Sequence, residues 1–173
     1  MNDVEQSVFL VGRVLAGFFY LILGMNHFGN YPAMTAMVGE MGIPAPGVAV
    51  IVTGILLVVA GVFFLIGYHP LLGVLAAALF FVPVTLVMHP FWAIEDPGER
   101  SREVSIFMRN IGLLGATLMF VGIKRPWKFS LDEILARRNN RGDADVEEVD
   151  IVAEEPREST YDPDREPPPP REV

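Results

Sequence analysis

Apolar residues lie in long runs along this chain, and charged residues rarely interrupt them. Residues 41–94 contain no Asp, Glu, Lys or Arg at all. A helix that crosses a bilayer needs about 20 mainly apolar residues. This stretch is therefore too long for one span and fits two, with a break at residues 67–70. The pattern predicts an integral membrane protein.

Four membrane spans of similar length are predicted, at residues 8–26, 48–66, 71–88 and 106–123. Lipid cannot hydrogen-bond exposed backbone groups, and the segments lack the alternating pattern of barrel strands, so each span should be a helix. The predicted fold class is an all-α membrane protein, with a four-transmembrane-helix bundle over residues 1–123.

A short amphipathic helix is predicted between the first two spans, at residues 32–42. Met34, Met37 and Val38 recur at helical spacing, and Pro32 occupies a position that suits the first turn. We expect this helix to lie at the membrane surface and to pack on the bundle, rather than to form a lid over a ligand.

A second interfacial helix is predicted after the last span, within residues 124–141. Ser130 and Glu133 have the spacing of a capping box, and Leu131 and Ile134 begin an apolar stripe among basic residues. Such a basic amphipathic helix is expected to rest on an anionic leaflet of the lipid bilayer.

The net charge of −8 belongs to the C-terminal tail. From Asp143 onward lie 12 of the 21 acidic residues but only 3 of the 13 basic ones. Residues 142–173 are acidic and Pro-rich, which predicts a disordered tail. No basic face is interleaved with aromatic residues, so nucleic-acid binding is not supported. The chain has no cysteine, which excludes dithiol chemistry and thiolate metal sites.

Basic residues cluster after the last span, at Lys124, Arg125 and Lys128 and again near residue 138. The positive-inside rule then places the C-terminus in the cytoplasm, and four spans return the N-terminus to the same side. The expected location is the plasma membrane, with the first apolar segment retained as an anchor.

The first span carries its polar and small residues on one face. Arg13, Gly17, Tyr20, Gly24 and His27 follow each other at spacings of four and three, so their stripe should face the bundle interior. Arg13 and His27 lie roughly 21 Å apart along the axis and cannot share one compact site. We expect Arg13 to reach outward to lipid phosphates.

Polar residues from three spans are predicted to meet in the outer half of the bundle. The site residues are His27 and His89 as proton-transferring groups, Arg109, Asn110, Trp92, Asn26 and Tyr20 as ligand contacts, and Arg13 and Tyr68 as separate polar groups on the inner side. A mid-helix arginine costs ~2.5–3.5 kcal/mol on insertion scales. An arginine retained at that cost indicates a functional site.

These side chains offer hydrogen bonds to a lipophilic ligand that carries carbonyl groups. A quinone headgroup fits, with histidine as the proton donor or acceptor. Haem held between His27 and His89 is a weaker alternative, because both residues lie at helix ends. Two histidines with few carboxylates nearby do not predict a metal site.

The chain resembles the DoxX/DoxD-like family of small four-helix membrane proteins over about residues 8–133. The matching pieces are Arg13, Gly24-Met25-Asn26-His27-Phe28, Gly42-Ile43-Pro44-Ala45-Pro46, Met88-His89-Pro90-Phe91-Trp92, Phe107-Met108-Arg109-Asn110 and Phe129-Ser130-Leu131-Asp132. The resemblance implies a subunit of a quinone-linked oxidoreductase, or a partner of redox-stress proteins. Many members carry a glutamate in the second span, where this chain has Leu57.

The sequence thus favours a redox-associated or quinone-interacting subunit in the lipid bilayer. With no cysteine, flavin motif or haem-binding motif, it would need a redox enzyme as a partner, and contacts between copies of the chain are also open. Two other classes stay open: a non-catalytic scaffold that recruits soluble enzymes through its basic helix and acidic tail, and a small transporter or lipid-handling protein that uses the Arg13–Tyr20–His27 stripe as a path.

Overall fold

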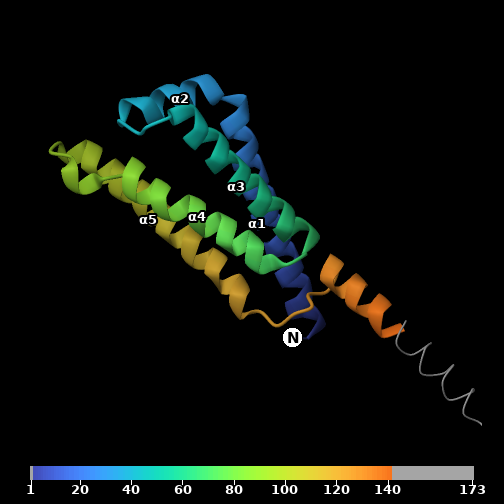
Figure 1. Ribbon diagram of the computed structural model, residues 1–173. Helices are drawn as coiled ribbons and strands as arrows, with labels where there is room; N and C mark the ends of the chain where they lie inside the picture. The colour runs from blue at the N-terminus through green and yellow to red at the C-terminus, as the bar shows by residue number, and fades with distance from the viewer. Residues whose placement is uncertain (1, 142–173) are drawn as a thin grey trace, which may run out of the picture. The chain divides into compact units, whose positions relative to one another are not determined.

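The computed structural model describes residues 2–141, and the regular secondary structure in that range is helical (Figure 1). The helices are α1 (Asp3–Gly29), α2 (Tyr31–Glu40), α3 (Pro46–Ile66), α4 (Pro70–Met88), η1 (Phe91–Ala93), α5 (Pro97–Met119) and η2 (Phe120–Gly122), and residues 131–141 are helical too. In the described range, four helices are long and apolar enough to cross a membrane. The predicted all-α membrane fold is confirmed. The predicted disordered tail lies outside the described residues.

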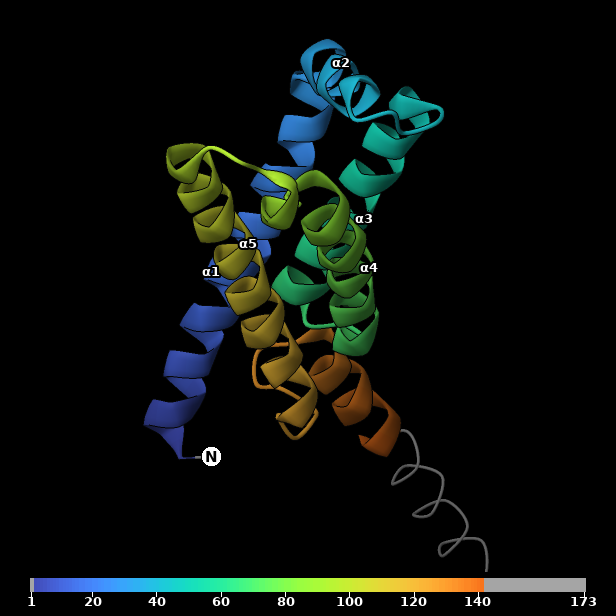
Figure 2. The ribbon, with the colours of Figure 1, turned by 90° about the vertical axis from the view of Figure 1, so that its left-hand side faces the viewer.

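The membrane helices pack in chain order within the compact unit that extends to Ala136. α1 lies against α3, α3 against α4, and α4 against α5, while the short helix α2 contacts α1 and α3 (Figures 1 and 2). Both figures show α2 at the end of the bundle where α1 finishes and α3 begins. One end of the bundle is therefore formed by α2 with the ends of α1 and α4, and the other by the α3–α4 turn and the segment after α5.

Glycine lets α1 and α3 approach to backbone contact. A Cβ atom built on Gly61 of α3 would lie 2.7 Å from the backbone nitrogen of Leu21 and 2.8 Å from the carbonyl oxygen of Gly17. A Cβ on Gly24 would lie 2.9 Å from the carbonyl oxygen of Gly54. The residues of α1 that are buried are Arg13, Gly17, Tyr20 and Gly24. The prediction that this stripe faces the bundle interior is confirmed.

The apolar core lies where α1, α3 and α4 meet. Leu57, Ala60 and Phe64 of α3 are completely buried there, together with Phe81 of α4. Leu57 is the position at which a glutamate is expected from the family resemblance. Leu57 is completely buried among apolar side chains, where a carboxylate would be costly without a hydrogen-bond partner.

Local capping explains where the shorter helices begin. α2 has a proline in its first turn, as predicted, and begins one residue before the predicted segment. The hydroxyl of Ser130 accepts a hydrogen bond from the backbone N–H of Glu133 at 3.1 Å. This is one half of the predicted capping box, and the Glu133 carboxylate also accepts a hydrogen bond from the backbone N–H of Phe129 at 2.8 Å.

Candidate functional site

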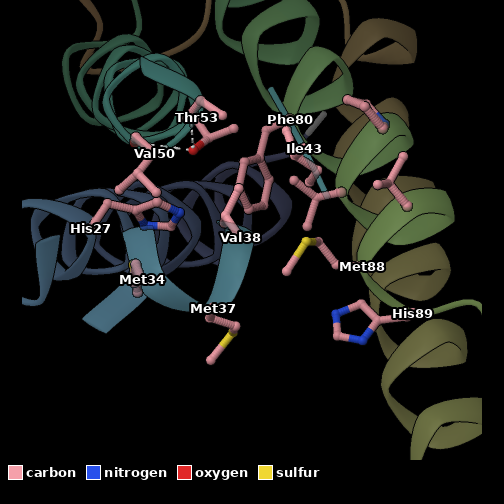
Figure 3. Close-up of a pocket in the computed structure, with 14 residues that line it drawn as sticks. His27, Met34, Met37, Val38, Ile43, Val50, Thr53, Phe80, Met88 and His89 are labelled. Carbon is pink, nitrogen blue, oxygen red and sulfur yellow. Dashed lines mark hydrogen bonds between the residues drawn. The ribbon is translucent and has the colours of Figure 1, made fainter. Parts of the chain in front are cut away.

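A cavity of about 530 Å³ opens at the α2 end of the bundle (Figure 3). Four helices contribute to it, together with the residues that follow α2 and α4. The lining side chains are His27, Met34, Met37, Val38, Ile43, Ala49, Val50, Thr53, Phe80, Pro83, Val84, Val87, Met88 and His89. Almost all of this wall is apolar, and its volume falls in the range of small-molecule sites.

His27 enters the cavity from the last turns of α1. Its Nδ1 lies 2.9 Å from the carbonyl oxygen of Leu23, and its ring packs edge-on against Phe80 at 5.8 Å between centroids. A carbonyl oxygen can only accept a hydrogen bond, so Nδ1 carries the proton. In the neutral ring, Nε2 is then left with its lone pair. This nitrogen is available to accept a hydrogen bond from a ligand.

His89 follows the end of α4 and forms a pair with a carboxylate of α5. Its Nδ1 lies 2.7 Å from Oε2 of Glu103, and both side chains are about four-fifths buried. The carboxylate fixes the ring orientation and leaves Nε2 as the second free imidazole nitrogen. Glu103 is a site residue that the sequence analysis missed. Four acidic residues surround the α4–α5 connection, and only the antiparallel register of the two helices selects this one.

Helix α2 forms one wall of the cavity through Met34, Met37 and Val38. It also packs on α3, as the sequence predicted, but the same apolar face lines a space large enough for a ligand. Methionine is unbranched and polarizable, so this wall can adapt to apolar groups of different shapes.

Arg109 does not join the two histidines, and this part of the predicted convergence is wrong. Its side chain is exposed on α5, whereas that of Asn110 is buried and 7% exposed. Successive residues of a helix point about 100° apart, so the two side chains cannot face the same space. Asn110 takes the inward direction, and neither residue lines the cavity.

Two other predicted ligand contacts also lie outside the cavity. The side chain of Trp92 is 59% exposed and meets the rings of Phe91 and Phe107 edge-on. Asn26 is exposed, and its side-chain oxygen accepts a hydrogen bond from Asn30 at 2.5 Å. Asn26 directly precedes His27, and Trp92 lies three residues after His89. Both histidines line the cavity, and closeness in sequence led us to place Asn26 and Trp92 there too.

Tyr20 lies in the core rather than in the cavity. Its hydroxyl forms a hydrogen bond with that of Thr117 on α5, and its ring meets those of Phe64 and Phe81. The rest of the stripe on α1 is filled by α3, as the contacts of Gly17 and Gly24 show. Gly17, Tyr20 and Gly24 therefore form a packing face against α3 and α5.

Arg13 is buried, which contradicts the prediction that it reaches outward to lipid phosphates. Only 2% of the residue is exposed. The segment after α5 folds over this end of the bundle, where Nη2 of Arg13 donates to the carbonyl oxygen of Phe129 at 2.8 Å. The guanidinium carbon lies 5.8 Å from the ring centroid of Trp127, a cation–π contact. Nε and Nη1 are buried without a hydrogen-bond partner in the described chain.

Tyr68 lies in the turn between α3 and α4, apart from the cavity as predicted. Its ring stacks on that of Phe63 and meets that of His69 edge-on, with centroids 6.2 and 4.4 Å away. These aromatic contacts account for its position in the fold.

Comparison with family models gives a match over part of the chain. Residues 8–90 match the DoxX family, a segment that begins in α1 and ends just after His89. No curated protein and no solved structure matches the chain. The match covers three of the four membrane helices and both cavity histidines. It agrees with the resemblance drawn from the sequence motifs: residues 8–90 are similar to the DoxX family, and the described residues include four helices that are long and apolar enough to cross a membrane.

Proposed function

We propose that this protein is a redox-associated membrane subunit that binds a quinone-class ligand in the cavity at the α2 end. One observation carries the proposal: His27 and His89, from segments far apart in the sequence, line the same apolar cavity. An apolar wall suits the ring and the tail of a lipophilic molecule, and the two imidazoles supply polar contacts for its oxygen atoms.

The hydrogen bonds of the histidines favour the hydroxyl-bearing, reduced form of such a ligand. In the neutral rings, Nδ1 donates to Leu23 and to Glu103, so each Nε2 is an acceptor. A quinol hydroxyl donates to such a nitrogen, whereas a quinone carbonyl needs a protonated ring. When Nε2 of His89 takes up a proton, the Glu103 carboxylate balances the charge, as the aspartate does in a catalytic triad.

These residues can hold and move protons, but a quinol that is oxidised also gives up two electrons, which imidazole and carboxylate groups cannot accept. The chain has no cysteine. The proposed activity therefore requires a redox enzyme as a membrane partner, and the role of this chain is to bind the ligand and exchange its protons. The position of the cavity at one end of the bundle supports this role.

We further propose that the protein resides in the plasma membrane with both termini in the cytoplasm, as the basic residues after α5 indicate. The cavity would then open toward the outer face. The chain has no cysteine, so single cysteines placed at Gly42 and at Lys128 would each report one side of the membrane to an impermeant thiol reagent. Labelling of both positions from the same side would overturn this orientation.

Equilibrium binding of a short-chain benzoquinol to the purified protein in lipid nanodiscs tests the function. We expect His27→Ala and His89→Ala each to weaken binding by roughly tenfold, the effect of one lost hydrogen bond in an apolar site. His69→Ala is the matched control, because this third histidine is exposed in the α3–α4 turn and does not line the cavity. Affinity that is absent in the parent protein, or unchanged in both cavity variants, would disprove the proposal.

A further inference from the structure

The outward face of α5 differs from the other surfaces that the bundle presents to lipid. α5 is the least apolar of the four membrane helices and also the least buried: 11% of its most apolar stretch is buried, against 22% to 39% in the others. A helix that mostly faces lipid should be the most apolar one, because lipid offers no compensation for polar groups. The composition of α5 is therefore typical of a helix that contacts protein on its outward face as well as on the face toward the bundle.

Polar and small residues form a continuous stripe on this face. Ser105, Arg109, Gly112 and Ala116 follow at spacings of four, three and four, and all four are exposed. A Cβ atom added at Gly112 would meet nothing within 4 Å. In α1 and α3 the glycines of the stripe meet the backbone of the neighbouring helix. Small residues on a membrane helix permit such close approach.

The charge on this face has no counterpart in the described part of the chain. No carboxylate in residues 2–141 forms an ion pair with Arg109. Glu103, which lies six residues before it on α5, is paired with His89. A cation in a membrane span is costly unless an opposite charge or water compensates for it. The unpaired guanidinium beside an unfilled small-residue surface indicates that a molecule with a negative group belongs there.

We propose that this face of α5 binds a transmembrane helix of a different membrane protein, which presents a carboxylate to Arg109 and small residues to Gly112 and Ala116. A second copy of this chain does not fit. A symmetric parallel contact would bring the two Arg109 side chains toward each other, and residues 104–123 contain no acid to separate them. None of the contact residues lines the cavity, so this proposal is independent of the proposed function.

A lipid phosphate is the competing source of negative charge. Side chains of a helix tilt toward its N-terminus, so Arg109 can extend toward the nearer membrane surface. A phospholipid would satisfy the guanidinium but would not require the glycine surface next to it. The two sources can therefore be separated by changing Arg109 and Gly112 independently.

The test uses the full-length protein in phosphatidylcholine vesicles and a synthetic membrane-spanning peptide as the probe. The peptide has a leucine background, a small-residue seam and either Glu or Gln at the depth of Arg109, and association is measured by energy transfer. We expect the Glu peptide to bind about tenfold more tightly than the Gln peptide. Arg109→Leu should remove this preference, and Gly112→Leu should weaken both peptides.

Gly12→Leu is the matched control for Gly112→Leu, because Gly12 is an exposed glycine of α1 with nothing within 4 Å of an added Cβ. Equal binding of the Glu and Gln peptides would overturn the proposal. So would a preference that disappears in mixed phosphatidylcholine–phosphatidylglycerol vesicles, since a lipid headgroup would then occupy Arg109. Energy transfer between two labelled copies that Gly112→Leu abolishes would instead assign this face to self-association.

Discussion

α1 and α5 carry the same short pattern, an arginine followed at helical spacing by small residues, in opposite surroundings. In α1, Arg13 and Gly17 are buried, whereas in α5, Arg109 and Gly112 are exposed. The difference arises from what lies opposite. α3 presents its own glycines to α1, whereas a Cβ atom added at Gly112 of α5 would meet nothing within 4 Å. A stripe of small and polar residues thus identifies a contact surface, but not the molecule that fills it.

Of the substitutions that test this difference between α1 and α5, Gly24→Leu should change the free energy of unfolding most. A Cβ at this position would lie 2.9 Å from the backbone nitrogen of Val58, and backbone cannot move aside as a side chain can. We expect a loss of about 3 kcal/mol in the free energy of unfolding, at the upper end of overpacking costs. Unfolding of the purified protein by a denaturing detergent measures this. Gly112→Leu is the control, and an equal loss there would mean that the α5 face is already packed.

Arg13→Ala should have the next largest effect, a loss of about 2 kcal/mol. The substitution removes the hydrogen bond to Phe129 and the contact with Trp127, and it leaves a space where the guanidinium was. The loss is smaller than for Gly24→Leu, because two buried N–H groups without partners disappear as well. The segment around Lys128 should also become cleavable by trypsin.

Arg109→Ala is the matched control for Arg13→Ala. An exposed side chain without a partner in the described chain should change the stability of the purified protein by less than about 0.5 kcal/mol. If Arg109→Ala proves as destabilising as Arg13→Ala, the contrast between the two helices is wrong. An Arg13→Met variant that restores most of the lost stability would show that the guanidinium contributes by filling space rather than by hydrogen bonding.

A coupling of about 1 kcal/mol is expected between Tyr20 and Thr117, in the range of hydrogen bonds between membrane helices. The Thr117 hydroxyl donates to the carbonyl of Leu113, so the Tyr20 hydroxyl is the donor in their bond. A double-mutant cycle of Tyr20→Phe and Thr117→Val measures this link between α1 and the inner face of α5. Additive effects of the two substitutions would show that the hydroxyls act separately.

Most of the fold was predictable because lipid imposes a simple rule on sequence. Runs of about 20 apolar residues located the four membrane helices, and the spacing of Arg13, Gly17, Tyr20 and Gly24 gave the buried face of α1. The ends of the helices were less predictable. α1 begins at Asp3, where Asn2 and Glu5 form a capping box that lies outside the apolar run.

The candidate site was only partly predictable. His27 and His89 lie at the ends of α1 and α4 on the same side of the bundle, and both line the cavity there. The orientations of Arg13 and Arg109 were predicted wrongly. The free-energy cost of placing an arginine in a membrane helix does not tell which way its side chain points. Arg13 was expected to reach lipid, but a segment more than 110 residues later in the chain covers it. Arg109 was expected to face inward, but its neighbour Asn110 takes that position.

The smallest change in stability is expected for Gly112→Ala, which adds a single methyl group to the outward face of α5. An added methyl group at Gly112 meets nothing within 4 Å, and alanine favours a helix over glycine by up to about 1 kcal/mol. The isolated protein should therefore become slightly more stable or stay unchanged in detergent unfolding. The same substitution at Gly61, whose Cβ would lie 2.7 Å from the backbone nitrogen of Leu21, should be destabilising. A change of the same sign at both positions would remove the distinction between a filled and an unfilled glycine surface, and with it the reason to seek a partner for α5.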